Sequence, residues 1–285
     1  MTQCKWAVSL GELEGTHQKA WGTTEYKSRS EPTVFFGLYD LRDYIALWRH
    51  KGKSWVLWAG SDIRNLRANF VFNDGKLKWL SYLFANEGFK DFLIKHVLSK
   101  AEHWVENEAE RDALRAVGIE AKICPSFLGD IDEFPVSFKP GNKIYTSVSG
   151  DNFEQYGWDK INELAKANPM IEFHFYGNNK EWVPDWNNMI VHGRVPKEQM
   201  NKEIKEMQGG LRMTEFDGAS EIIVKAMLMG QYCFSLIDYP YVHNPKDLHL
   251  LTSLKTANIE GRDWWRKNLN NYPWNINYQK KQEER

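Results

Sequence analysis

The stretch Gly210–Gly230, with the sequence GLRMTEFDGASEIIVKAMLMG, decides the fold class of this chain. It begins with a short apolar segment, Gly210–Met213, that indicates a buried strand, and it continues into an acidic turn at Asp217-Gly218. Ser220 has the chemistry of a helix N-cap, and the apolar spacing of Glu221–Met229 predicts a helix that the final glycine ends. A buried strand that runs through a turn into a helix is the repeating unit of α/β proteins with parallel sheets.

The start of the predicted helix also predicts a ligand. Free N–H groups and the partial positive charge at a helix N-terminus favour an anion, so we expect a diphosphate to bind near Gly218, Ala219 and Ser220. Beside that anion, the carboxylate of Asp217 suits the hydroxyl groups of a sugar or a ribose. Arg212, at the end of the preceding strand, is a candidate phosphate ligand, with a surface ion pair as the alternative. A diphosphate next to a polyol describes a nucleotide sugar.

Strand and helix patterns alternate along most of the chain, which predicts parallel sheets covered by helices. The expected strands are Trp6–Leu10, Thr33–Leu38, Ser54–Trp58, His103–Glu106, Ala121–Cys124, Lys143–Val148, Ile171–Tyr176, Met189–His192, Gly210–Met213 and Tyr232–Leu236. The expected helices include Leu41–His50, Phe89–Ser99, Glu108–Val117, Trp158–Ala167 and Glu221–Met229.

The alternation stops once, in the segment 126–142, which prolines and glycines punctuate and which has no sustained period. We therefore expect one domain over 1–125, a linker over 126–142 and a second domain over 143–258. The segment 259–285 is expected to cross back to the first domain. The predicted fold class is α/β, with two Rossmann-like domains; the family resemblance given below implies that they face each other across a cleft.

Length, composition and charge narrow the possible classes of protein. A chain of 285 residues with 42% hydrophobic residues can bury two cores. The formal net charge of −1 does not favour binding to bulk nucleic acid. The three cysteines, Cys4, Cys124 and Cys233, lie far apart and are typical of reduced thiols in a cytoplasmic protein. The N-terminal residues do not resemble a signal peptide, and no apolar run reaches the ~20 residues of a membrane span, so we expect a cytoplasmic protein without a transmembrane segment.

Several common α/β chemistries lack their motifs in this sequence. Near the first strand, Gly11 and Gly15 do not have the G-x-G-x-x-G spacing of a dinucleotide-binding turn. A P-loop and the G-x-Ser-x-G turn of hydrolases are also missing. The eight histidines are scattered without metal-ligand spacing, so we expect no metal and no cofactor apart from the nucleotide sugar itself.

The stretch that decides the fold resembles the donor-site signature of the large retaining, family 4-like group of GT-B glycosyltransferases. That signature has an acidic residue, a turn with glycine and, eight positions later, a second acidic residue followed by A-M-x-x-G. Asp217 and Gly218 match its beginning, and Ala226–Gly230 matches its end. Lys225 stands where the second carboxylate, which holds the ribose hydroxyls in this group, is usual.

Other segments match the same group in the order that it requires. Val148-Ser149-Gly150 resembles the strand and phosphate loop that open the donor domain, and Gly177 and Arg194-Val195 resemble strand ends whose backbone receives the nucleotide base. Trp58–Asp62 is similar to the W-x-G-T-D turn of small members. We expect Asp62 and His17 to join Asp217 as catalytic residues facing the cleft; for Asp62 the alternative is a helix N-cap.

Two positions depart from the pattern. Tyr156 stands where a basic residue is common, so neutralisation of the phosphates is expected from Arg212 and Lys225. Lys225 and Glu221 are four residues apart on one helix, and a surface ion pair between them is the alternative to a phosphate role.

The resemblance implies a glycosyltransferase that moves a sugar from a nucleotide-sugar donor to an acceptor hydroxyl, retaining and independent of metal. Two acceptors stay open, a glycan or lipid-linked sugar and a modified (hydroxymethyl) base in DNA, and the oligomeric state is open as well. The loss of the usual carboxylate at Lys225 favours an alternative, a non-catalytic protein that binds nucleotides or sugars on the same fold.

Overall fold

The computed structural model describes residues 1–7, 16–67, 86–148, 153–177 and 184–278. They divide into two compact units. The first contains Met1–Gly129, Phe216–Gly218 and the segment from Leu269 onward, and the second contains Asp130–Glu215 and Ala219–Asn268.

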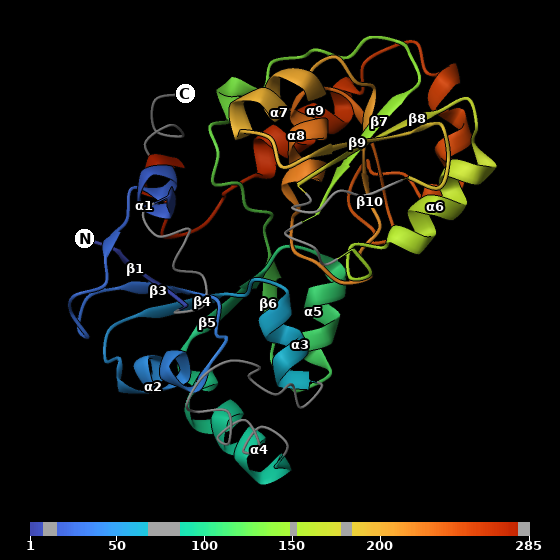
Figure 1. The fold of residues 1–285 in the computed structure, drawn as a ribbon. Helices are drawn as coiled ribbons and strands as arrows, with labels where there is room; N and C mark the ends of the chain where they lie inside the picture. The colour runs from blue at the N-terminus through green and yellow to red at the C-terminus, as the bar shows by residue number, and fades with distance from the viewer. Residues whose placement is uncertain (8–15, 68–85, 149–152, 178–183, 279–285) are drawn as a thin grey trace. The chain divides into compact units, whose positions relative to one another are not determined.

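The first unit is a parallel sheet with the strand order β2-β1-β3-β4-β5-β6. Its strands are β1 (Gln3–Trp6), β2 (Thr24–Glu25), β3 (Thr33–Phe36), β4 (Ser54–Leu57), β5 (Glu102–Val105) and β6 (Ala121–Ile123). Its helices are α1 (Thr16–Trp21), α2 (Leu41–Arg49), α3 (Ser61–Arg67), α4 (Glu87–His96) and α5 (Glu108–Arg115), with a short 3-10 helix at Leu98–Lys100. A second short 3-10 helix, Ile131–Glu133, already belongs to the second unit. Figure 1 shows α3 and α5 side by side.

The second unit is built in the same way, with the strand order β11-β10-β7-β8-β9, again parallel throughout. Its strands are β7 (Lys143–Ser147), β8 (Glu172–Tyr176), β9 (Met189–Gly193), β10 (Gly209–Arg212) and β11 (Tyr232–Ser235). Its helices are α6 (Trp158–Ala167), α7 (Lys197–Ile204), α8 (Glu221–Leu228) and α9 (Ile259–Asn268), with a 3-10 helix at Pro245–Ser253.

Burial on both faces explains why the strands are continuously apolar. Every residue of Thr33–Phe36 is buried, as expected for a parallel strand covered by helices on both sides. On one face, Val56 and Trp58 pack with Leu47 of α2; on the other, Trp55 packs with aromatic residues of the first unit. The α/β class predicted from the sequence is confirmed.

The segment after Ile259 divides differently from the expectation. Helix α9 packs against α8 in the second unit, where Trp265 is fully buried and its indole N–H donates to Pro240 O at 3.0 Å. The return to the first unit begins at Leu269 instead. There Tyr272 and Trp274, stacked at 4.4 Å, complete the aromatic core. The side chain of Trp265 on α9 therefore stabilises the second unit.

Candidate functional site

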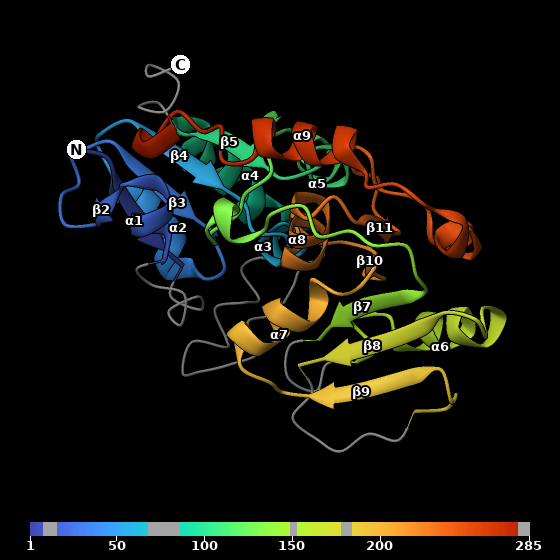
Figure 2. The ribbon, with the colours of Figure 1, turned by 90° about the horizontal axis from the view of Figure 1, so that it is seen from above.

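The carboxyl ends of β7, β8 and β9 meet at one edge of the second sheet, and the strand arrows in Figure 2 point to this edge. Gly177, just after β8, has φ +95°, and a Cβ there would lie 2.2 Å from Val148 O. Its N–H donates to Gly193 O at 2.9 Å. Only glycine fits this close approach, so the turns after three strands are held together where ligands bind in open parallel sheets.

Arg212 ends β10 at the same edge. Its side chain is buried with 8% exposure, its guanidinium lies 4.5 Å from the centre of the Tyr156 ring, and one N–H donates to Ser147 O at 3.3 Å. The cation–π contact and this hydrogen bond hold a positive charge next to Tyr156. The role of Arg212 as a phosphate ligand that compensates for Tyr156 stays a prediction.

Helix α8 begins as predicted. Ser220 is its N-cap and accepts a hydrogen bond from Ile222 N at 3.4 Å. The helix lies tightly on β10, because a Cβ at Gly210 would lie 3.0 Å from Ile222 and 3.2 Å from the Ala226 side chain. The small residues of the signature therefore set the distance between strand and helix.

Lys225 is almost completely buried on α8, with 3% of its side chain exposed. Its ammonium lies 2.7 Å from Glu221 Oε2 and 5.8 Å from the centre of the Phe134 ring. Burial alone would raise the pKa of Glu221, but the charges of Lys225 and Lys197, the latter 3.9 Å away, outweigh it and hold that pKa below its usual value. The ion pair within α8 is thus the observed arrangement, although its lysine is buried rather than on the surface.

The turn Asp217-Gly218 belongs to the first unit. The side-chain amide of Asn107 donates to Asp217 O at 2.7 Å, and a Cβ at Gly218 would lie 1.9 Å from Glu106 Oε2. Glu110 is fully buried and accepts from Glu106 N at 2.8 Å; burial first, and then the charge of Glu106, raise its pKa well above the usual value. Sequence reasoning missed these acidic residues, although polar side chains directly after an apolar strand are a recognisable signal.

Asp62 is fully buried and satisfied by the backbone. Its carboxylate accepts from the N–H groups of Leu38, Ala59 and Ile63 at 2.9 to 3.0 Å. Burial raises its pKa to about 6, against the opposing effect of these hydrogen bonds. The side chain ties the ends of β3 and β4 to the start of α3, so its geometry favours a structural role, and the catalytic role stays a prediction.

His17 lies on α1 with no exposed surface. Its ring packs edge-on against Trp6 at 4.2 Å and Trp21 at 6.1 Å, and neither ring nitrogen has a hydrogen-bond partner among the described residues. Burial lowers its pKa to about 4, which keeps the imidazole neutral. This surrounding is that of a core histidine, and its catalytic role also stays a prediction.

The remaining donor-site residues lie at the turns. Arg194 is exposed and Val195 half-buried between β9 and α7, while Ala219 is half-buried just before α8. Gly150 lies outside the described residues.

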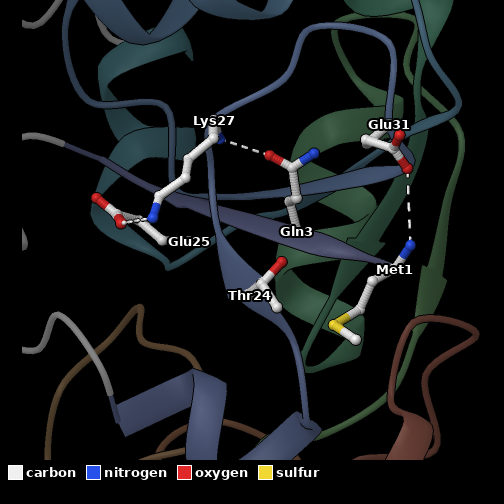
Figure 3. A pocket seen from close by; sticks show the side chains of 6 residues that line it. All are labelled: Met1, Gln3, Thr24, Glu25, Lys27 and Glu31. Carbon is white, nitrogen blue, oxygen red and sulfur yellow. Dashed lines mark hydrogen bonds and ion pairs between the residues drawn. The ribbon is translucent and has the colours of Figure 1, made fainter.

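The first unit has a hollow of about 300 Å³. Its lining side chains, drawn in Figure 3, include Gln3, Thr24 and Glu31. These residues stand at the amino ends of β1, β2 and β3. Ligands of parallel sheets bind at the opposite, carboxyl ends, so this hollow is not the candidate site.

Two further observations concern metals and membranes. Within the described ranges, no group of three or more His, Cys, Asp or Glu side chains is arranged to hold a metal ion. None of the described helices is both long and apolar enough to cross a membrane.

Comparison with solved structures identifies the fold. The chain is similar to sucrose-phosphate synthase from Thermosynechococcus elongatus (TM-score 0.57, 10% identity, 96% of this chain and 76% of that one) and to HepE from Anabaena in complex with UDP-glucose (0.51, 12%, 88% and 79%). It is also similar to TarM from S. aureus in complex with UDP (0.51, 14%, 85% and 52%). No protein-family model and no curated protein matches the sequence.

The chain therefore has the GT-B glycosyltransferase fold, as its sequence signature predicted. It spans about half the length of TarM, and identities of 10 to 14% leave the substrates of these proteins as statements about them alone.

Proposed function

We propose that the chain is a glycosyltransferase whose nucleotide-sugar donor binds at the carboxyl edge of the second sheet. The observation that carries this proposal is the arrangement there: two glycine turns in contact, the buried guanidinium of Arg212 on the Tyr156 ring, and the capped start of α8. Backbone N–H groups and a fixed cation at one edge suit a diphosphate. The UDP and UDP-glucose bound by TarM and HepE support a uridine nucleotide as the first donor to test.

In the proposed reaction, the bond between the anomeric carbon and the diphosphate breaks, and the nucleoside diphosphate leaves with the electron pair. The acceptor oxygen bonds to the anomeric carbon on the same face, and its proton passes to an oxygen of the leaving diphosphate. Arg212 stabilises the charge that develops on the leaving diphosphate. Asp217 orients the sugar through its hydroxyl groups, and no metal takes part. Among acceptors we propose a glycan, since TarM is solved with an α-GlcNAc-glycerol.

Release of nucleoside diphosphate from a panel of UDP- and GDP-sugars, with and without glycan acceptors and EDTA, tests the proposal. We expect turnover that EDTA leaves unchanged and an α-anomeric product from an α-linked donor. Hydroxymethylated DNA in the same panel tests the other acceptor. The matched pair of variants is Arg212→Met and Arg266→Met, because Arg266 is a half-buried arginine of the same unit that pairs with Asp132 at 2.9 Å. Loss of at least tenfold in rate, about 1.4 kcal/mol, is expected for Arg212→Met alone.

The second candidate is a binding protein without catalysis. It is favoured by the ion pair of the buried Lys225 with the half-exposed Glu221, because Lys225 stands where the family resemblance expects the donor carboxylate. Saturable binding of UDP-glucose with no hydrolysis or transfer for any acceptor would select this candidate and reject the enzyme.

A further inference from the structure

Two histidines from neighbouring strands lie against each other on one face of the second sheet. Nδ1 of His174 on β8 is 2.8 Å from Nε2 of His192 on β9. Where β8 advances by one residue to Tyr176, β9 passes from Val191 to Gly193, so His192 is the extra residue of a β-bulge. Bulges redirect side chains. This one places the His192 ring flat on the Tyr176 ring, at 4.2 Å and 13°.

A carboxylate closes each end of this pair. At the first end, Glu172 Oε1 lies 2.6 Å from His174 Nε2 and 3.3 Å from the ammonium of Lys143. Burial would raise the pKa of Glu172, but its contacts with His174 and Lys143 lower it, so this carboxylate is charged at neutral pH.

The second end is on helix α7. Glu203 Oε2 accepts from the Tyr176 hydroxyl at 2.7 Å and lies 3.6 Å from His192 Nδ1, and Glu203 Oε1 accepts from Gln199 at 2.8 Å. The hydrogen bonds from Tyr176 and Gln199 lower the pKa of Glu203. The chain of contacts thus runs from β8 across β9 to α7.

The distances determine where the protons are. A contact of 2.6 Å between His174 Nε2 and a carboxylate requires a proton on Nε2. Burial lowers the pKa of both His174 and His192, so both rings are neutral at pH 7. A neutral His174 then has a bare Nδ1, which accepts from Nε2–H of His192. Both rings are therefore Nε2–H tautomers, and Nδ1 of His192 is left without a proton.

This arrangement has room for one additional proton only. The first can enter at Nδ1 of His192, where it faces Glu203 at 3.6 Å. A second proton must enter at Nδ1 of His174, and two N–H groups would then oppose each other across 2.8 Å. Because hydrogen bonds need one donor and one acceptor, double protonation breaks the contact between the rings.

We propose that His174 and His192 are positioning residues for the nucleotide, an inference that rests on the proposed donor site. His192 directly precedes Gly193, whose φ is +72° and whose carbonyl accepts from Gly177 N at the carboxyl edge. The neutral pair holds the bulge, and through it the turn Gly193–Pro196 and the start of α7. The doubly protonated pair releases that turn, so nucleotide binding weakens in acid.

The variant His174→Gln tests this inference. Its amide can accept from His192 and donate to Glu172, but it cannot take up a proton. We expect its affinity for UDP at pH 7.5 to stay within about twofold of the unmodified protein, and its loss of affinity at pH 5 to be at least about tenfold smaller. His249→Gln, at an exposed histidine of the same unit whose Nδ1 lies 3.0 Å from Lys246 O, is the control and should keep the unmodified pH profile. Titration of UDP itself cancels in this comparison.

Nitrogen NMR of the histidine rings provides a readout that needs no ligand. At pH 7.5 we expect Nε2–H tautomers for both His174 and His192. Identical pH profiles for His174→Gln and the unmodified protein, or an Nδ1–H tautomer at His192, would overturn the inference. If UDP, GDP and ADP all fail to bind, the proposed function fails. Amide hydrogen exchange then decides: protection factors in α7, corrected for the intrinsic exchange rate, that are equal at pH 5 and pH 7.5 would overturn the inference too.

Discussion

For Lys225, the effect of a substitution expected from the structure differs most from the effect expected from the sequence. As a surface ion pair, Lys225 and Glu221 would contribute only about 0.3–0.5 kcal/mol. In the structure Lys225 is 3% exposed and Glu221 about half exposed, at 2.7 Å. Two charges about 4 Å apart interact by about 4 kcal/mol at an effective dielectric constant of 20. Because water screens the exposed half of Glu221, we take roughly half of that, about 2 kcal/mol.

Three variants separate attraction, repulsion and burial. Lys225→Met keeps the length of the side chain and removes its charge, so we expect the free energy of unfolding to fall by about 1–2 kcal/mol. Lys225→Glu adds repulsion from Glu221 and a buried carboxylate, for a loss of about 3 kcal/mol or more. The exchange of both residues, Glu221→Lys with Lys225→Glu, restores an attractive pair and should recover at least about 1 kcal/mol of that loss.

Urea unfolding measures these differences, and calorimetric titration with UDP measures binding in the same proteins. Stability of Lys225→Glu within about 0.5 kcal/mol of the unmodified protein would refute the buried-pair reasoning. Equal UDP affinities for Lys225→Met and the unmodified protein would discard a phosphate role for Lys225. Tighter binding by Lys225→Glu would show that the usual ribose contact had simply been lost.

Three further predictions concern single positions. Gly177→Ala should unfold the second unit or cost more than about 3 kcal/mol, since its Cβ would meet Val148 O at 2.2 Å, whereas Gly118→Ala, with φ +81° and open space, should cost only about 1 kcal/mol in chemical unfolding. Burial raises the pKa of Asp62 to about 6, so its contribution to stability is present below pH 4 and is lost as the pH rises to 6. Relative to Asp62→Asn, the free energy of unfolding of the unmodified protein should fall by roughly 3 kcal/mol over that interval. A difference between the two proteins that does not change with pH would contradict this. Asp217→Asn should lower turnover at least tenfold, about 1.4 kcal/mol, with unfolding unchanged, and equal turnover would reject its role.

The sequence predicted the strands and helices whose periodicity is strong. Helix α6 has the predicted bounds Trp158–Ala167, and α8 begins at Glu221 after the predicted N-cap. Helix α7 was not predicted, because Lys197–Ile204 contains only two apolar residues and its N-cap is a proline without a side-chain hydrogen bond. A helix is predicted from apolar residues that recur every three or four positions, and a helix as short as α7 contains too few such repeats.

The candidate site was predictable where backbone geometry decides it and not where tertiary contacts do. The position of Gly177 at a strand end could be predicted, because a glycine directly after an apolar strand indicates a turn. The environment of Glu110 depends on Asn107 and Glu106 folding over it, and the burial of Asp62 and His17 depends on which side of a short helix faces the sheet. Spacing in the sequence carries no information about that choice. The contact between His174 and His192, which determines their tautomers, depends on a β-bulge that no local sequence pattern predicts.

The aromatic side chains of Tyr272 and Trp274 have a consequence for biosynthesis. They pack into the first unit next to Trp21 and Trp104, and Asn270 accepts a hydrogen bond from the Trp21 indole at 3.2 Å. A ribosome makes these residues only after the entire second unit. The first unit is therefore completed after the second unit. Its core lacks these aromatic side chains, and its apolar surface stays exposed, while the second unit is synthesised. Chaperones that bind nascent chains would meet this protein through that open core, because the aromatic residues that complete it are made after all of the second unit.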